Sequence, residues 1–375
     1  MVRINTVRAL MAPVFLFCLL VISATPANAQ IEDTGKLIQS GIDDSNILIR
    51  EYLKPAARGF GAGLNAGWFN SASTHSVLGF DVTFRLNAAI VPGSDKAFDI
   101  AELGLQKITL ANSGSGITPT ASGSSQSGPE VVVLETVEMM GGMQHTLELA
   151  RFTMPAGSGF GYVPTPMLQA SVGLPTGTDI IIRMLPTYTI DEYGSFSLWG
   201  LGVKHDLKTW LPGGDLIPFD LSVMAGYTNF TTTTGYTVEP GSGSYETDPG
   251  NYDRPETWDN QRLDIGSSAF TVNALIGKTF PVITLYGGVG YETSTMNIKS
   301  IGNYPVIIPE KLGDFYTGNR ELDIITDPLD IQIRGTNNFR ALAGLRLKLL
   351  ILTISADYTV AEYSMASVGV GFSFR

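Results

Sequence analysis

The sequence predicts an all-β protein, a transmembrane antiparallel β-barrel of about 14 strands preceded by a short N-terminal helical segment. Apolar and polar residues alternate beyond Pro55 over segments of about nine to eleven residues, the length of a tilted membrane-crossing strand. After the first thirty residues or so, no apolar run reaches the roughly eighteen that a spanning helix requires. Charged residues make up only 16% of the chain, which contains 42 glycines, and its polar positions mix glycine, serine and threonine with isolated charges. A closed barrel accounts for all three features.

The first 29 residues (1–29) predict a cleaved export signal. Two arginines precede an apolar stretch at 9–23, and the small-residue motif Ala-Asn-Ala follows at 27–29. A retained membrane helix is the alternative, but this run is short and Pro13 interrupts it. Cys18 is the only cysteine and lies inside the signal, so the exported chain is expected to carry no thiol.

Residues 30–57 predict a helical segment that ends at Pro55, because apolar residues between Asp33 and Leu53 fall at helical spacings. Two placements remain open for it, as a plug in the barrel lumen or as a periplasmic helix at the barrel mouth. The side chains expected to form the plug are Ile38, Ile42, Ile49, Tyr52 and Leu53.

The barrel region is expected to span 58–375 and to open with the stretch RGFGAGLNAGWF at 58–69. Its glycines suggest a dinucleotide-binding loop, but neither flank supplies the strand and helix that such a loop needs. Alternation instead predicts the first strand, whose apolar residues Phe60, Leu64 and Trp68 face lipid. The residues expected to face the lumen are Gly59, Gly61, Gly63 and Asn65.

Thirteen further strands are expected from the same alternation. A soluble sandwich also alternates, but its strands are shorter, about five or six residues, and aromatic residues near many strand ends here are typical of interfacial girdles. The fourteen expected strands are 59–69, 76–91, 97–110, 129–139, 145–153, 166–174, 178–189, 194–205, 217–230, 267–280, 282–295, 336–348, 350–360 and 364–375. The charged residues expected to face the lumen are Asp81, Arg85, Arg183, Lys204, Asp220, Arg340, Arg346 and Asp357.

Loop lengths predict the orientation of the barrel. Counted alternately, the long connections 111–128, 154–165, 231–266 and 296–335 fall on one side, and mostly short turns fall on the other. Long outer loops and short periplasmic turns are typical of bacterial outer-membrane barrels. We therefore expect the outer membrane of a Gram-negative bacterium, with both termini in the periplasm and with membrane lipid and lipopolysaccharide as partners.

The last strand supports the same compartment. Val368, Val370, Phe372 and Phe374 form an apolar face that resembles the C-terminal signal strand read by the barrel-insertion machinery, although Arg375 follows the final aromatic residue. The insertion machinery is therefore an expected partner.

The composition argues against several other functions. A net charge of −11 makes nucleic acid an unsuitable partner. His75, His145 and His205 are far apart in sequence and form no convergent catalytic pattern, so no enzyme activity, cofactor or metal is expected. The acidic loop 245–260 has oxygen ligands but no EF-hand spacing; a solvated loop and a divalent site shared with lipopolysaccharide phosphates both remain open.

A helix before the first strand, about 14 strands and a glycine-rich wall together resemble the outer-membrane transporters of long-chain fatty acids and aromatic hydrocarbons. The resemblance covers the architecture of 33–375 and implies an N-terminal hatch and a wall opening for hydrophobic substrates. The Asn-Pro-Ala hatch signature of that family does not occur here. The stretch YLKPAARGFGAGLNAGWFNSA followed by GFDV is more similar to uncharacterised exported barrel proteins.

Two functions follow from these expectations. The first is a passive channel or transporter for small, hydrophobic molecules. The second is a structural or surface-interaction barrel with a sealed lumen and outer loops that bind partners.

Overall fold

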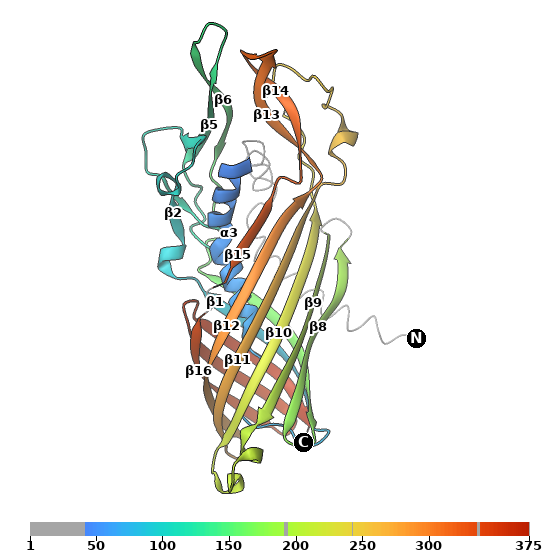
Figure 1. The fold of residues 1–375 in the computed structure, drawn as a ribbon. Coiled ribbons are helices and arrows are strands. Elements are labelled where there is room, and N and C mark those ends of the chain that lie inside the picture. The colour runs from blue at the N-terminus through green and yellow to red at the C-terminus, as the bar shows by residue number, and fades with distance from the viewer. Residues whose placement is uncertain (1–41, 191–193, 242, 336–337, 375) are drawn as a thin grey trace.

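The computed structural model describes residues 42–190, 194–241, 243–335 and 338–374. Ten antiparallel strands close into a barrel (Figure 1), because β11 pairs with both β10 and β12 and so joins the two ends of the sheet. The strands, in their order around the wall, are β11 (Arg262–Thr279), β10 (Asp220–Gly235), β9 (Gly194–Asp206), β8 (Thr178–Ile190), β7 (Tyr162–Leu174), β1 (Phe80–Ile90), β18 (Met365–Phe374), β17 (Leu352–Val360), β16 (Phe339–Leu349) and β12 (Ile283–Ile301). The expected closed barrel is confirmed, but its strand number of 14 was wrong.

Alternation along the strands sorts side chains between the two faces of the wall. In β18 every second residue is buried and the others are exposed, and the pairing of β1 with β18 closes the sheet between its N- and C-terminal strands. Phe80 and Phe374 lie opposite one another, and their rings stack with centroids 4.8 Å apart on the outer face. The apolar face of each strand therefore points outward, as the sequence predicts.

The segment expected to form the first strand is a helix. α3 (Ile42–Asn65) continues through Pro55 and ends only at Asn65, so the expected boundary between residues 57 and 58 falls inside it. The alternating residues also recur at four-residue spacing, which places Phe60 and Leu64 one turn apart on one helix face. The strand prediction was wrong because a period of two and a helical row of small residues look alike in so short a stretch.

Three other expected strands, at 97–110, 129–139 and 145–153, do not belong to the barrel wall. They lie in the connection between β1 and β7, residues 91–161, which forms one part of a head at one end of the barrel. One face of its strands is buried against an apolar cluster, which produces alternation without any contact with lipid. The strands of this part are β2 (Ala97–Asp99), β3 (Ile108–Leu110), β4 (Ile117–Pro119), β5 (Glu130–Glu138) and β6 (Gln144–Thr153).

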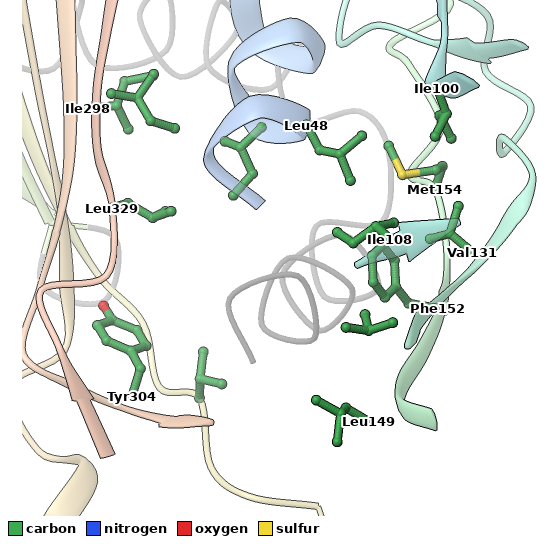
Figure 2. Packing of buried hydrophobic residues seen from close by; sticks show 14 of the residues in the cluster. Leu48, Ile100, Ile108, Val131, Leu149, Phe152, Met154, Ile298, Tyr304 and Leu329 are labelled. Carbon is green, nitrogen blue, oxygen red and sulfur yellow. The ribbon is translucent and has the colours of Figure 1, made fainter. Parts of the chain in front are cut away.

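A second hairpin, β13 (Asn303–Leu312) and β14 (Phe315–Thr326), projects from the same end of the barrel, and β15 (Asp330–Arg334) extends the wall beside β12 (Figure 1). The N-terminal part of α3 is packed between the β2–β6 part of the head and this second part, which comprises β13, β14 and β15. Figure 2 shows Leu48 of α3 with Ile108 and Phe152 on one side and Ile298 and Leu329 on the other.

The connections differ strongly between the two barrel ends. Short connections at 175–177, 207–219, 280–282 and 350–351 lie at one end. The long connections at 91–161, 236–261 and 302–338 lie at the other, together with the start of α3. The long connections thus lie together at one end, as expected. Residues 91–97 and 140–144, expected among the short turns of the other side, lie instead in the 91–161 connection, and the four-residue connection 361–364 is also at the end with the long connections. The N-terminal end of α3, however, lies at the end with the long connections.

Candidate functional site

The candidate site is the barrel lumen, which α3 enters from the head (Figure 1). Residues 66–79 continue through it toward the short turns, because Trp68, Phe69 and Ala72 pack among wall residues and His75 bonds to Asp179 beside the turn at 175–177. Below the head, Asn65 Nδ2 donates a hydrogen bond to the carbonyl of Thr293 at 3.0 Å. Near the short turns, the backbone N–H of His75 donates to the Asp179 carboxylate at 2.9 Å. The same segment is therefore bonded to the wall at widely separated levels, so it occupies the position of a plug.

The upper part of α3 is anchored in the head. The Asp44 carboxylate accepts the backbone N–H groups of Gln106, Lys107 and Ile108, each through an oxygen within 3.0 Å. The Tyr52 hydroxyl donates to the carbonyl of Ala156 at 2.7 Å. Burial raises the pKa of Tyr52 to about 12, so this phenol stays protonated and remains a donor at neutral pH.

Two arginines from opposite parts of the wall cap the C-terminal end of α3. The Arg183 guanidinium donates to the carbonyls of Leu64 at 2.7 Å and Ala66 at 2.6 Å, and Arg340 donates to the carbonyl of Asn65 at 3.1 Å. The last carbonyls of a helix have no partner within it and carry the negative end of its dipole, so cations are favoured there. The wall therefore recognises the end of the plug by its backbone.

The buried positive charge of Arg183 is stabilised by groups of the plug rather than by a carboxylate. Its side chain is fully buried, and within the described residues no carboxylate lies within ion-pair distance of it. Its guanidinium carbon lies 3.7 Å from the ring centroid of Trp68, and its Nε donates to the side-chain oxygen of Gln169 at 3.2 Å. The indole face and the helix carbonyls supply the negative potential that a buried cation needs.

The other buried cations combine a carboxylate with a plug contact. Arg340 lies 3.0 Å from the Glu292 carboxylate. Arg85 forms an ion pair with Asp357 and also donates to the carbonyl of Phe69 at 2.7 Å. A buried charge is strongly destabilising unless it is paired and hydrogen-bonded. The hydrogen bonds to the plug therefore help to stabilise the buried arginines of the wall.

The lower lumen repeats this arrangement. Arg346 donates to the side-chain oxygen of Asn70 at 3.0 Å, and the Asn70 amide donates to Asp81 at 3.3 Å. Lys204 pairs with Asp179 at 3.1 Å and donates to the carbonyl of Ser73 at 2.7 Å. Beyond the helix, the chain is thus held by charged groups of the wall down to the short turns.

Glycines allow the plug and the wall to approach closely. A Cβ atom at Gly63 would lie 2.1 Å from Oγ1 of Thr165 on β7. On the wall, a Cβ at Gly202 would lie 2.7 Å from the Trp68 ring, and one at Gly226 would lie 2.6 Å from it. The plug glycines therefore permit helix packing, and the wall glycines make room for Trp68.

The structure brings together most of the residues expected to face the lumen, but several by a different route. Gly59, Gly61, Gly63 and Asn65 lie on α3 inside the lumen, not on a wall strand. Phe60, Leu64 and Trp68, expected to face lipid, pack inside the barrel. Asp220 lies at the short-turn end, where it pairs with Lys208 at 3.1 Å.

The side chains expected to form the plug differ from one another in their surroundings. Ile49 is buried, and Leu53 packs against the apolar cluster around Leu48. Ile42 is the first helical residue, and Ile38 lies outside the described residues. Gln169, Asn273 and Glu292 supply further contacts in the lumen that no sequence pattern indicates, because they lie on wall strands among other polar residues.

In the part of the wall that the structure describes, the ladder between β7 and β8 is interrupted over several residues. Their pairing runs only from Leu174↔Thr178 to Gln169↔Arg183, although both strands continue toward the head. Within the described pairings, the other neighbouring wall strands are paired over most of their shared length. The upper parts, 162–168 and 184–190, therefore form a seam of unpaired edges.

Prolines explain the seam. The backbone groups of Gly161 and Gly173 form hydrogen bonds on the side of β7 that faces β1. Because successive residues of a strand direct their backbone groups to opposite neighbours, the even-numbered residues of β7 direct theirs toward β8. Pro164 and Pro166 stand at such positions and have no N–H to donate. The register of the lower pairs, continued upward, places Pro166 opposite Pro186.

An apolar cluster lies on the inner side of this seam. Leu64 of α3 packs with Met167 of β7 and Leu185 of β8, and Phe60 and Phe230 adjoin them with ring centroids 5.0 Å apart. The position of the seam along the barrel axis follows from Met184 at its lower end, because Met184 is paired with Trp199 of β9. Trp199 and Tyr227 form an exposed aromatic pair on the outer face with ring centroids 5.5 Å apart. The seam thus begins at the level of exposed aromatic residues.

The histidines are not brought together. His75 Nδ1 lies 3.0 Å from Asp179, His205 contacts Thr178 and Trp210, and His145 lies on β6 in the head. In the acidic loop, carboxylates serve local contacts, such as that of Glu246 with Arg320. Within the described part of the chain, no group of three or more His, Cys, Asp or Glu side chains is arranged to hold a metal ion.

Among the described helices, none is long and apolar enough to cross a membrane, a finding that does not bear on strands.

Several solved structures match most of this chain, at low identity and with low TM-scores. The translocator domain of the autotransporter NalP from Neisseria meningitidis is 11% identical, with 80% of this chain and 90% of that chain covered and a TM-score of 0.26. The beta domain of the Bordetella autotransporter BrkA is 11% identical, with 79% and 99% covered and a TM-score of 0.22. A mutant of the Rh. blastica porin is 10% identical, with 79% and 99% covered and a TM-score of 0.14.

No curated protein matches this sequence. A family profile, in contrast, matches residues 8–374, nearly the whole sequence. The chain therefore belongs to the family of unknown function DUF6588.

Proposed function

We propose that the protein is an outer-membrane β-barrel whose lumen is sealed by its own N-terminal segment and whose head serves as an interaction surface outside the cell. The observation that carries this proposal is the threading of α3 and residues 66–79 through the lumen, with buried arginines bonded to the backbone of the plug. A diffusion pore would need an open, hydrated path where these contacts lie.

The membrane assignment rests on the outer face of the wall. Large apolar side chains are exposed on every barrel strand, a distribution that is costly in water but favourable in lipid. Examples are Val82, Leu201, Val272, Leu285 and Val370, each between 41% and 53% exposed. Long connections at one end and short turns at the other favour the orientation with the head outside.

Conductance across a planar bilayer tests the seal. The purified wild-type barrel is expected to hold a closed baseline, whereas the double variant Arg183→Gln/Arg340→Gln should show frequent openings. Both substitutions remove charged hydrogen bonds to the end of the helix, each contributing about 1.5–3 kcal/mol. Arg334→Gln is the matched control, because Arg334 is exposed on β15.

Heat-modifiable migration on a gel shows whether each variant retains a folded barrel. Steady, large conductance in the wild type would overturn the sealed-lumen proposal. So would a folded double variant that stays as closed as the control.

The seam favours a second function, the passage of small hydrophobic molecules between the bilayer and the lumen. Unpaired edges at the level of the outer aromatic residues and an apolar cluster behind them are features that such a route needs. Uptake of a fluorescent fatty acid by cells that carry a cross-link between Leu168→Cys and Met184→Cys, with and without reductant, tests this function. Equal uptake in the two states would argue against a route through the seam.

A further inference from the structure

The tip of the β5–β6 hairpin gathers three methionines and one histidine in the sequence MMGGMQH, residues 139–145. The hairpin projects from the head, away from the barrel (Figure 1). Gly141 and Gly142 at the turn both have positive φ, 95° and 78°, which permits the tight reversal that brings the two strands together. The methionines on either side of the turn therefore lie close in space as well as in sequence.

The register places three of these side chains on one face. The Met139 N–H donates to the carbonyl of Met143 at 2.8 Å, so these two residues lie directly opposite one another. The next pair on the same face is Val137↔His145, because alternate residues of a strand share a face. Cβ atoms of opposite residues lie about 4.5–5.5 Å apart, and methionine side chains are long enough to direct their sulfur atoms to a common point.

Packing does not account for Met140, Met143 and His145. Lower on the same face, Val137 and Leu147 are buried, 4% and 8% exposed, as residues that cover a core should be. Met140 is 70% and Met143 is 65% exposed, and His145 is also exposed. Met139 is half-buried against the other hairpin, because it forms a backbone bridge with Tyr316 and its methyl group lies beside Gly318 of β14.

We propose that Met139, Met143 and His145, with Met140 at the turn, bind a soft monovalent metal ion, Cu(I) or Ag(I). Thioether sulfur is a soft, uncharged ligand that selects Cu(I) over hard cations, and imidazole nitrogen is compatible with the same ion. Cys18 is the only cysteine and lies in the predicted signal segment, so no thiol of the exported chain competes for the metal. This site does not depend on the function proposed for the lumen.

Titration of the folded barrel in detergent micelles tests the site, with Ag(I) as a redox-inert probe and Cu(I) under ascorbate in competition with bicinchoninate. Methionines labelled with ¹³C at the ε-methyl report which thioethers bind. The wild type is expected to bind one ion and to shift the methyl signals of Met139 and Met143. The double variant Met139→Leu/Met143→Leu should weaken Ag(I) binding at least tenfold, and His145→Gln by a smaller factor.

Met184→Leu is the matched control, because Met184 is 58% exposed on β8, far from the hairpin. Affinity unchanged in the double variant, or an equal loss in the control, would overturn the proposal. Zn²⁺ binding as tight as Ag(I) binding would also overturn it, because it would indicate a site that depends on imidazole rather than thioether.

Discussion

At the residue scale, the lumen is held together by cations that bind backbone carbonyls. Arg183 illustrates the principle, since it contacts two carbonyls at the end of α3 and stacks on Trp68. Backbone carbonyls are present whatever the side chains of the plug, so this mode of binding requires only that the helix end at the right level. Small residues then allow the plug to approach the wall closely.

Gly63→Ala is expected to lower the thermal stability of the folded barrel, because its Cβ would lie 2.1 Å from Thr165 Oγ1 and 2.6 Å from Thr165 Cβ. Overpacking of this kind costs about 1–3 kcal/mol. The temperature at which the heat-modifiable band disappears measures the effect. Thr165→Gly, added to the variant, should recover part of the loss because it removes the colliding atoms.

Gly266→Ala is the control for this prediction, because no atom lies within 4 Å of a Cβ built at Gly266 of β11. Equal stability of Gly63→Ala and Gly266→Ala would show that α3 does not pack against β7 as closely as described.

At the element scale, β7 and β8 are distinguished by prolines. Proline within a sheet removes a ladder hydrogen bond and is found mainly at edges. Pro164, Pro166 and Pro186 stand where the two strands would otherwise pair, so two neighbouring wall strands each acquire an edge. Within the hydrocarbon layer such unpaired groups would be costly, but at the interface water can satisfy them.

The double variant Pro166→Val/Pro186→Val should extend the β7–β8 ladder toward the head, because it restores two opposed N–H donors. Amide hydrogen exchange of peptides that cover 162–168 and 184–190 is expected to slow, about tenfold for each 1.4 kcal/mol gained. Pro175→Ala, in the short turn after β7, serves as the control. Exchange as fast in the double variant as in this control would mean that something other than proline keeps the seam open.

Several elements could be predicted from the sequence because their patterns have one structural meaning. Strand β18 alternates without interruption, and nothing competes with its assignment. Residues 59–65 could not be assigned from their pattern, because small residues that alternate with larger ones fit both a strand with a period of two and a helix with one face of small residues. Arg85, Arg183 and Arg340 could be placed in the lumen because an isolated charge on a membrane strand must face inward. Their bonds to α3 could not be predicted, because they depend on where a segment distant in sequence ends its helix.

At the scale of the whole molecule, the direction of threading has a consequence for orientation. α3 begins beside the long connections and the chain then descends to the short turns, where β1 starts. With the head outside the cell, the first described residues also lie on the outer side of the barrel. The proposed orientation therefore implies the opposite of the periplasmic placement expected for the N-terminal end of this helix.

Cysteine labelling on intact cells tests this orientation, since Cys18 is the only native cysteine and lies in the predicted signal. Ser113→Cys in the head should react with a membrane-impermeant maleimide on whole cells. Leu216→Cys, at a residue 87% exposed in the connection between β9 and β10, should react only after the outer membrane is permeabilised. The opposite labelling pattern would show that the barrel has the inverse orientation. Labelling of both sites on intact cells whose outer membrane is shown to be sealed would contradict a single orientation.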